Sequence, residues 1–527
     1  MHPSVHTDTF ARDNLPPESE WPELTFTLPD LQYPPQLNCV DLLLDRHVRE
    51  GSGSNVAIRS LDDTWTYAEY LSRVNRIANV LVNKMGVESG NRVLLRFPNS
   101  PLFAACYLAV LKCGAVAVPT MPLLRATELK AIVDKARIRH AICDSRLTDE
   151  LGKISFEHVV LSDDLHDLMS SENDAFDTVA TASDDVALIA FTSGTTGKPK
   201  GCMHFHSDVL SMCRTFSEQV LQPRPDDIFI GSPPLAFTFG LGGLLTFPLL
   251  AGASTVLLEN ATPPNLADAV EKMAATICFT APTAYKVLLA EDQVAKLSSL
   301  RIAVSAGEHL PRPVYVEWTE RTGTTMIDGI GATEIIHIFL SMTGDGDKPG
   351  STGLPVTGYE IRVVDESLNT VPAGVEGLLA VRGPTGCKYL ADSRQTDYVK
   401  NGWNLTGDIF RCDEDGHYWY VARGDDMIIS SGYNISGPEV EEALLGHAAV
   451  AECAVVAWPD EERGHVPKAF VVLASGAEPG DELTLKLQDH VKMTIAPYKY
   501  PRAIEYIEAL PKTQTGKVQR FALRQSA

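Results

Sequence analysis

Positive charge is scarce in this sequence of 527 residues: 45 Lys and Arg stand against 68 Asp and Glu, which gives a formal net charge of −23. A general binder of nucleic acids or of anionic membranes would favour a basic surface, so neither kind of partner is expected. An anionic small-molecule substrate would have to meet a local basic site.

Disulfide and export signals are also missing. The ten cysteines form no CxxC pair, which is typical of reduced thiols in a cytoplasmic protein rather than of a disulfide framework or a zinc site. Residues Met1 to Asn38 lack the positively charged start and apolar core of a secretory signal. The seven prolines of this segment instead predict an extended arm laid over the main body.

Long hydrophobic runs are few, and the most membrane-like one is Phe239 to Leu258. Four glycines and a proline interrupt these twenty uncharged residues. A buried helix running into a strand at Ser254 to Leu258 therefore fits better than a membrane span.

Helical and strand patterns alternate from residue 64 onward. Thr66 and Glu69 predict a capping box at the start of a helix. Strands are expected at Arg92 to Phe97 and at Ala115 to Pro119, on either side of a buried helix at Leu102 to Lys112. This alternation predicts the α/β fold class with mostly parallel sheets.

The most informative stretch is TSGTTGKPKG at 192–201, which follows the apolar run Val186 to Phe191. That run is short enough for a strand buried on both faces. Glycines let backbone N–H groups approach a ligand, hydroxyls donate, and two lysines add positive charge, which together suit a polyphosphate. The alternative is a flexible surface turn. The residues predicted to hold the polyphosphate are Thr192, Ser193, Gly194, Thr195, Thr196, Gly197, Lys198 and Lys200.

This loop is not a Walker A motif. Thr192 and Pro199 stand where that motif needs Gly and a hydroxyl residue.

A second stretch, DGIGATEIIHIFL at 328–340, places Glu334 after a glycine-rich turn. A carboxylate beside a phosphate site would be repelled by its ligand unless a divalent cation lay between them, so Glu334 is a candidate Mg²⁺ ligand. The alternative is a helix N-terminal carboxylate, which the helix dipole favours.

Three further motifs are TGD at 406–408, RGDD at 423–426 and PKTQTGK at 511–517. In this order and spacing, together with TSGTTGKPKG and GATE, they resemble the adenylate-forming superfamily of acyl-CoA synthetases, peptide-synthetase adenylation domains and luciferases over nearly the whole chain. Within it, DGIGATEIIHIF and the aromatic loop PPLAFTFGLGG at 233–243 are most similar to aryl-CoA ligases, close to benzoate-CoA and 2-aminobenzoate-CoA ligases.

The resemblance implies a two-step reaction. An aromatic carboxylate attacks the α-phosphate of ATP, giving an acyl-adenylate and pyrophosphate, and the thiol of coenzyme A then displaces AMP. The implied catalytic residues are Lys198 for the outer phosphates, Thr333 for an α-phosphate oxygen, Glu334 for Mg²⁺, and Lys517, which bridges carboxylate and phosphate in the first transition state. Further implied ATP contacts are Gly307, Glu308, Asp328, Gly329, Ile330, Asp408 and Arg423.

The acid pocket is expected at Phe237, Phe239, Gly331 and His337, beside an uncharged run that suits an aromatic ring. If residues 334 to 337 are helical, His337 projects to the same side as Glu334. Core packing is the alternative for each Phe. His204 and His206 form an HxH pair with no third ligand nearby, so we expect them to be structural or close to the phosphates.

The resemblance divides the chain into a large α/β body of several subdomains, residues 1–424, and a small mobile α+β lid, residues 425–527. In the lid, Ser436 and Glu439 predict a capping box. Asp425 matches the family's hinge residue, and Gly432 would line the pantetheine tunnel, where a side chain would block the thiol. Lid strands are expected at Ala451 to Ala457, Ala469 to Leu473 and Ala503 to Ile507.

Two departures from the family pattern leave contacts open. Asn434 stands where many acyl-CoA synthetases carry an arginine, and the adenine-side turn reads SAGEHL.

Two other functions are possible for such a sequence: an enzyme that loads an aryl acid onto a carrier-protein thiol, and a non-catalytic protein on a decayed fold. The retained motif residues speak against the second. The accepted ring substituents, and whether the protein is a monomer or a homodimer, stay open.

Overall fold

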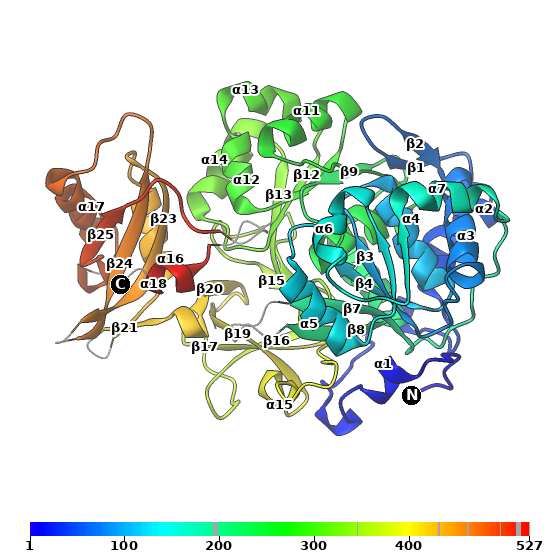
Figure 1. Ribbon diagram of the computed structural model, residues 1–527. Coiled ribbons are helices and arrows are strands. Elements are labelled where there is room, and N and C mark those ends of the chain that lie inside the picture. The colour runs from blue at the N-terminus through cyan, green and yellow to red at the C-terminus, as the bar shows by residue number, and fades with distance from the viewer. Residues whose placement is uncertain are drawn as a thin grey trace.

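A computed structural model describes residues 1–192, 199–344, 346–430, 433–460, 463–495, 497–512 and 518–525. In these ranges the strands form four sheets, three between residues 56 and 423 and one between residues 428 and 506 (Figure 1). The predicted α/β fold class is confirmed. Of the residues assigned to the site, Ser193, Gly194, Thr195, Thr196, Gly197, Lys198, Gly432 and Lys517 lie outside the described ranges.

The first sheet has the order β6-β5-β3-β4-β7-β8 and carries the glycine-rich loop. Its strands are parallel except for the last pair, β7 and β8, which is antiparallel. The expected strands and helix around residues 92–120 are confirmed. Their bounds, with the neighbouring elements, are β3 (Arg92–Arg96), α4 (Pro101–Lys112), β4 (Val116–Thr120), α5 (Ala126–Ala136), β5 (His140–Cys143), α6 (Thr148–Leu151), β6 (His158–Leu161), α7 (Ser162–Ser170), β7 (Val186–Thr192) and β8 (Lys200–Phe205).

The predicted capping box begins α3 (Tyr67–Asn83), which packs against α4. Thr66 Oγ1 accepts a hydrogen bond from the Glu69 N–H at 3.2 Å, and Glu69 Oε2 accepts one from the Thr66 N–H at 2.8 Å. Two of the helix's free N–H groups are thereby satisfied.

The second sheet has the order β15-β14-β13-β12-β11-β9-β10-β1-β2 and is parallel from β13 to β1. Helices α11 to α14 lie along one face of it in Figure 1. The strands are β1 (Val56–Arg59), β2 (Thr64–Thr66), β9 (Ile228–Gly231), β10 (Ser254–Val256), β11 (Ile277–Thr280), β12 (Ile302–Ala306), β13 (Thr325–Gly331), β14 (Ile338–Ser341) and β15 (Leu354–Pro355). The helices around it are α2 (Arg46–Arg49), α8 (His206–Met212), α11 (Pro263–Met273), α12 (Pro282–Leu288), α13 (Glu291–Val294) and α14 (Arg312–Thr322).

The uncharged window is a buried helical run of mixed type. It contains α9 (Thr238–Leu241), the π-helical η6 (Gly242–Thr246) and α10 (Phe247–Ala251), and β10 follows as predicted. Across the described parts of the chain, no helix combines the length and apolar character that crossing a membrane requires.

A third sheet is antiparallel and links the body to the C-terminal unit. It comprises β16 (Glu360–Val364), β17 (Glu376–Arg382), β18 (Val399–Lys400), β19 (Trp403–Cys412) and β20 (Tyr418–Arg423), with α15 (Gln395–Tyr398) beside it.

The C-terminal sheet stands apart from the body in Figure 1, and α16 and α18 face the body while α17 lies on the outer side. It comprises β21 (Ile428–Ser430), β22 (Tyr433–Ile435), β23 (Val450–Asp460), β24 (Gly464–Leu473) and β25 (Ala503–Tyr506), with α16 (Gly437–Leu445), α17 (Asp481–Thr494) and α18 (Arg520–Gln525). The strands expected there are confirmed.

The second predicted capping box is only half right. Ser436 Oγ accepts from the Glu439 N–H at 3.2 Å, but the Glu439 carboxylate accepts from Lys499 at 2.6 Å instead of turning back to the cap. The Lys499 ammonium group takes the place that the Ser436 backbone N–H would have in a capping box.

The N-terminal arm is largely irregular, with α1 (Phe10–Asp13) as its one α-helix in the described chain. Arg12 donates to buried Asp185 at 2.7 Å, and Ser4 donates to the same carboxylate. Asp185 directly precedes β7, so the arm is fastened at the base of the strand that leads into the glycine-rich loop.

Candidate active site

Two sheets meet at one point through their polar strand ends. Lys200 begins β8, and Glu334 follows β13 in the other sheet. Lys200 Nζ lies 3.3 Å from Glu334 Oε1. Thr192, the last residue of β7, is the register partner of Lys200, so the two strands that flank the glycine-rich segment pair next to Glu334.

Glu334 is held by a tyrosine as well as by this lysine. The Tyr389 hydroxyl donates to Glu334 Oε1 at 2.5 Å, and Lys200 Nζ donates to the Tyr389 oxygen at 2.9 Å. Burial, followed by the charge of Glu334, raises the pKa of Tyr389 far above its ordinary value, so the phenol keeps its proton and acts as a donor. Such charge-assisted bonds are short and strong.

Thr333 is fixed through its carbonyl by a buried polar chain. His204 Nε2 donates to the Thr333 oxygen at 2.8 Å, and His204 Nδ1 lies 3.6 Å from Asp208. Lys388 Nζ lies 3.1 Å from Asp208, and both side chains are almost fully buried. Burial alone would raise the pKa of Asp208, but Lys388 and His204 hold it below its ordinary value.

His206, the other half of the HxH pair, is the hydrogen-bond acceptor for the Cys39 N–H at 3.3 Å. Both histidines are thus occupied by structural contacts.

The expectation that residues 334 to 337 form a helix is wrong. Thr333–Ile335 is a single 3-10 turn (η8), and Ile336 then adopts φ 70° and ψ −40°. A positive φ is strained for a β-branched residue. Because the backbone reverses at Ile336, Glu334 contacts Tyr389 and Lys200, whereas His337 packs in a separate aromatic cluster.

His337 lies among three phenylalanine rings. Its ring centroid is 4.7 Å from that of Phe247, 5.4 Å from Phe216 and 5.8 Å from Phe239. Burial lowers the pKa of His337 to about 3, and the nearby Phe239 backbone offsets only part of this effect. Neither ring nitrogen has a well-aligned hydrogen-bond partner among the described residues.

Two glycines make room for this imidazole. A Cβ on Gly242 would lie 2.5 Å from the His337 ring, and a Cβ on Gly331 would lie 2.8 Å from the His337 carbonyl group. Any other residue at either position would push His337 out of place. Phe237 is the residue before α9, and its partly buried side chain packs against the same core cluster.

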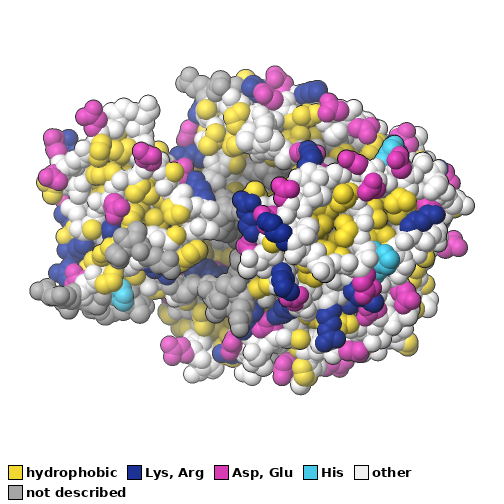
Figure 2. All heavy atoms as spheres, viewed as in Figure 1, with side chains coloured by type: hydrophobic (Ala, Val, Ile, Leu, Met, Phe, Trp, Pro, Cys, Tyr) yellow, Lys and Arg dark blue, Asp and Glu magenta, His cyan; other side chains and the backbone are white. Residues whose placement is uncertain are grey.

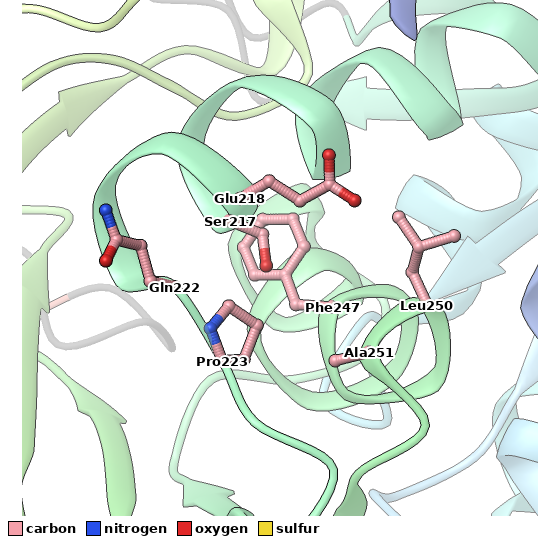
Figure 3. A pocket seen from close by; sticks show the side chains of 7 residues that line it. All are labelled: Ser217, Glu218, Gln222, Pro223, Phe247, Leu250 and Ala251. Atoms are coloured by element: carbon pink, nitrogen blue, oxygen red, sulfur yellow. The ribbon is translucent and has the colours of Figure 1, made fainter.

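The far side of this cluster opens to solvent. A surface hollow of about 180 Å³ is lined by Phe247, Leu250 and Ala251 on one side and by Ser217, Glu218, Gln222 and Pro223 on the other. Figure 3 shows the Phe247 ring beneath Ser217 and Glu218. One aromatic ring therefore separates the hollow from His337.

The residues expected around adenine end two adjacent parallel strands. Ser305 pairs with Asp328 and Ala306 with Gly329 in β12 and β13, which brings the turn at Gly307 and Glu308 beside Ile330. Gly307 has φ 93°, a conformation that glycine adopts without strain. Burial raises the pKa of Asp328 to about 8, and its neighbour Ser305 offsets only part of this rise.

Asp408 and Arg423, the predicted ribose contacts, are register partners on β19 and β20. Arg423 Nη1 donates to Asp408 Oδ1 at 3.2 Å and to the Thr406 carbonyl at 3.3 Å. Asp408 is buried and Arg423 is half-exposed.

The C-terminal unit approaches this region through α18. Arg520 donates to both oxygens of Glu441 at 2.8 Å. Desolvation and then the charge of Arg520 lower the pKa of His309 to about 4, and the His309 ring stacks on Tyr420 at 5.4 Å. Asp425 lies in the 3-10 turn Gly424–Asp426 (η9) between β20 and β21. The structure describes only its backbone.

Basic side chains gather beside the hollow that separates the two units in Figure 2, although the whole chain is acidic.

Sequence reasoning missed several residues of the site. Phe247 stands in the uncharged run that was expected to line the acid pocket, so the sequence did contain a signal for it. No sequence signal marks Tyr389, Phe216 or Phe279, because each reaches the site from a distant part of the chain.

Comparison with known families identifies the class of protein. The AMP-binding enzyme family matches residues 44–389, and the AMP-binding enzyme C-terminal domain matches residues 439–517. The chain belongs to the AMP-binding enzyme family.

Its similar relatives include aryl-CoA ligases. A benzoate-CoA ligase of Thauera aromatica is 36% identical over 514 residues, which cover 94% of this chain and 98% of that protein. The crystal structure of the anthranilate CoA ligase AuaEII with anthranoyl-AMP has 35% identity and a TM-score of 0.91, covering 95% of this chain and 99% of that one. A benzoate CoA ligase from Burkholderia xenovorans LB400 has 31% identity and a TM-score of 0.86, covering 93% and 100%.

Proposed function

We propose that this protein is an ATP-dependent aryl-CoA ligase. It activates a benzoate-type or 2-aminobenzoate-type acid as the acyl-adenylate and transfers the acyl group to coenzyme A, releasing AMP and pyrophosphate. The observation that carries the proposal is the aromatic cluster around His337, which lies three residues from the buried carboxylate Glu334. Similarity to benzoate and anthranilate CoA ligases over nearly the whole chain supports it.

The first half-reaction brings two anions together. The acid's ring would lie against Phe237, Phe239, Gly331 and His337, with its carboxylate directed toward Thr333. Thr192, Lys198, Lys200 and the residues between them would hold the outer phosphates, and Lys517 would offset the charges of the attacking carboxylate and the α-phosphate as the bond forms. Asp408 and Arg423 would bind the ribose, and Gly307, Glu308 and Asp328 to Ile330 would enclose the adenine.

Glu334 fits a Mg²⁺ ligand in chemistry and in place. It offers a hard carboxylate oxygen beside the phosphate-binding strand ends, and Mg²⁺ commonly takes one or two protein carboxylates and completes its shell with phosphates and water. When bound, the ion would neutralise charge on the leaving pyrophosphate.

The second half-reaction needs a different arrangement of the two units. We propose that residues 1–424 act as a body and residues 425–527 as a lid that turns about Asp425. The turn would withdraw Lys517 and bring Gly432 to a tunnel for the pantetheine arm. The position of Asp425 between the third sheet and the C-terminal sheet supports this division.

An acid panel tests the function directly. Pyrophosphate release and thioester formation would be measured with benzoate, 2-aminobenzoate, hydroxybenzoates and octanoate, with CoA or a phosphopantetheinyl carrier as acceptor. We expect aromatic acids with CoA to react best, because each ordered torsion of a flexible chain costs binding free energy. Equal turnover of octanoate, or transfer only to the carrier, would contradict the proposal.

A further inference from the structure

Among the described residues, Tyr389 makes the shortest hydrogen bond to Glu334. Its side chain is buried, and its hydroxyl donates to Glu334 Oε1 at 2.5 Å. Every other donor that approaches this carboxylate within the described residues belongs to Lys200.

The backbone around Tyr389 is anchored to the strand that returns from the glycine-rich loop. The Met203 N–H donates to the Lys388 carbonyl, and the Leu390 N–H donates to the Gly201 carbonyl, both at 2.8 Å. The Tyr389 N–H donates to Gln395 Oε1 at 2.9 Å. Tyr389 is thus fixed on both sides before it reaches Glu334.

The two donors converge on one oxygen only. Tyr389 and Lys200 both donate to Oε1, whereas no described residue donates to Oε2. Lys200 also donates to the Tyr389 oxygen, which polarises the phenol toward Glu334. Among the described residues, the carboxylate is thus held through one oxygen, and its second oxygen has no donor.

We propose that Tyr389 is a positioning residue for Glu334, whose hydroxyl holds Oε1 and leaves Oε2 for the Mg²⁺ that accompanies ATP. This inference rests on the proposed function, because it assigns the partner of Glu334 in the same site. Hydrogen-bond partners of metal-binding carboxylates fix the ligand's orientation, and their loss commonly weakens metal affinity by about 10- to 100-fold.

The arrangement also suggests a role for Lys200 in the catalytic cycle. Without nucleotide its ammonium group offsets the charge of Glu334. With a divalent cation on Glu334, Lys200 would be free to contact the phosphates, and Tyr389 would still hold Glu334 in place.

The test compares Tyr389→Phe with Tyr418→Phe. Tyr418 is a buried tyrosine whose hydroxyl donates to the Ile361 carbonyl at 2.7 Å in the third sheet, so its variant loses a similar bond away from Glu334. ATP affinity would be measured by calorimetry without acid, once with Mg²⁺ and once with EDTA. The quantity of interest is the ratio of the two dissociation constants.

We expect Tyr389→Phe to lower the Mg²⁺-dependent gain in ATP affinity by about 10-fold. Tyr418→Phe should leave the gain unchanged, and Tyr389→Phe should still convert supplied aryl-adenylate to thioester. An unchanged gain in folded Tyr389→Phe would overturn the inference, as would an equal loss of affinity with Mg²⁺ and with EDTA.

The same measurements separate this inference from the proposed function. If the wild-type protein forms no aryl-CoA, the proposed function fails. If it forms aryl-CoA while Tyr389→Phe binds MgATP like the wild type, only the role of Tyr389 fails.

Discussion

At the scale of single residues, two buried ionisable groups distinguish this site from an ordinary core. Asp328 and His337 are almost fully buried. Burial raises the pKa of Asp328 and lowers that of His337, so each neutral form is favoured. Groups with such shifted pKa values are common where a ligand supplies the missing partner. Asp328 lies on the proposed adenine side and His337 on the proposed acid side.

Asp328 should make stability depend on pH. Its folded pKa of about 8 exceeds the ordinary value of 3.8, so the folded state binds more protons between these two values. The free energy of unfolding should therefore fall as pH rises from about 4 to 8, by up to about 1.4 kcal/mol per pH unit from this group. Urea unfolding at pH 5.5, 6.5 and 7.5 measures the slope.

Asp328→Asn should remove the contribution of Asp328 to the pH dependence of the free energy of unfolding. Asp30→Asn, at an exposed position, should leave that pH dependence unchanged. Parallel stability curves for the wild type and Asp328→Asn would show that the carboxyl group ionises freely.

His337 should control which ring substituents are accepted. Its neutral imidazole has nitrogen atoms available to a polar substituent, and the loss of such a hydrogen bond in a buried site weakens binding by roughly 10-fold. We expect His337→Ala to change kcat/KM for 2-aminobenzoate relative to benzoate by about that factor. The KM for ATP should stay within about twofold. An unaltered ranking of acids with normal turnover would place His337 outside the acid pocket.

At the scale of elements, short irregular turns divide the site more than the regular helices and strands do. The 3-10 turn η8 and the strained Ile336 separate the phosphate side from the acid side within five residues. The π-helical η6 brings Gly242 against the His337 ring. The π-helical turn thus presents a residue without a side chain where the aromatic cluster is tightest.

Phe247, the first residue of α10, should set the length of the acid pocket. Phe247→Ala would join the pocket to the hollow of about 180 Å³ behind it. We expect kcat/KM for 4-propylbenzoate to rise relative to benzoate by about 10-fold or more, since each buried methylene contributes about 0.8 kcal/mol. Steady-state kinetics with the two acids measures the ratio.

Leu250→Ala is the matched control, because Leu250 lines the hollow but makes no ring contact with His337. It should leave the ratio unchanged. Thermal denaturation checks folding, since truncating a buried Phe costs about 3–5 kcal/mol. A folded Phe247→Ala with the wild-type ratio would mean that the pocket ends before this ring.

At the scale of the whole molecule, polar contacts between described residues join the C-terminal unit to the body. Lys286 of α12 donates to the Ala451 carbonyl, and Ser436 donates to the Val421 carbonyl next to the proposed hinge. Small polar contacts of this kind can be exchanged at little cost, which suits a unit that takes two positions.

The two half-reactions should therefore respond to different variants. Lys517→Ala should slow adenylate formation by about 100-fold or more, the scale of losing a main electrostatic stabiliser, and still convert supplied aryl-adenylate to thioester. Gly432→Leu should spare adenylate formation and obstruct the thiol. Pyrophosphate release and thioester formation from pre-made benzoyl-adenylate measure the two steps. Equal loss of both steps in both folded variants would favour one fixed site and contradict the hinge at Asp425.

The sequence by itself determined the fold class, the main strands and helices, and the local motifs. The apolar run before TSGTTGKPKG is β7, and the Thr66 capping box begins α3. Each depends on neighbours in the chain or on the regular geometry of strands, so spacing alone conveys it. The helix expected over residues 334–337 is wrong because the backbone reverses at Ile336, and helical spacing applies only within a regular helix.

The tertiary structure alone decided what surrounds the key side chains. Tyr389 meets Glu334 across 55 residues and Lys200 across 189, and Phe216 and Phe247 converge on His337 from separate helical segments. Such contacts depend on how two sheets pack, which no local pattern encodes. The same packing withdraws Asp328 and His337 from water, and this desolvation, rather than residue type, displaces their pKa values.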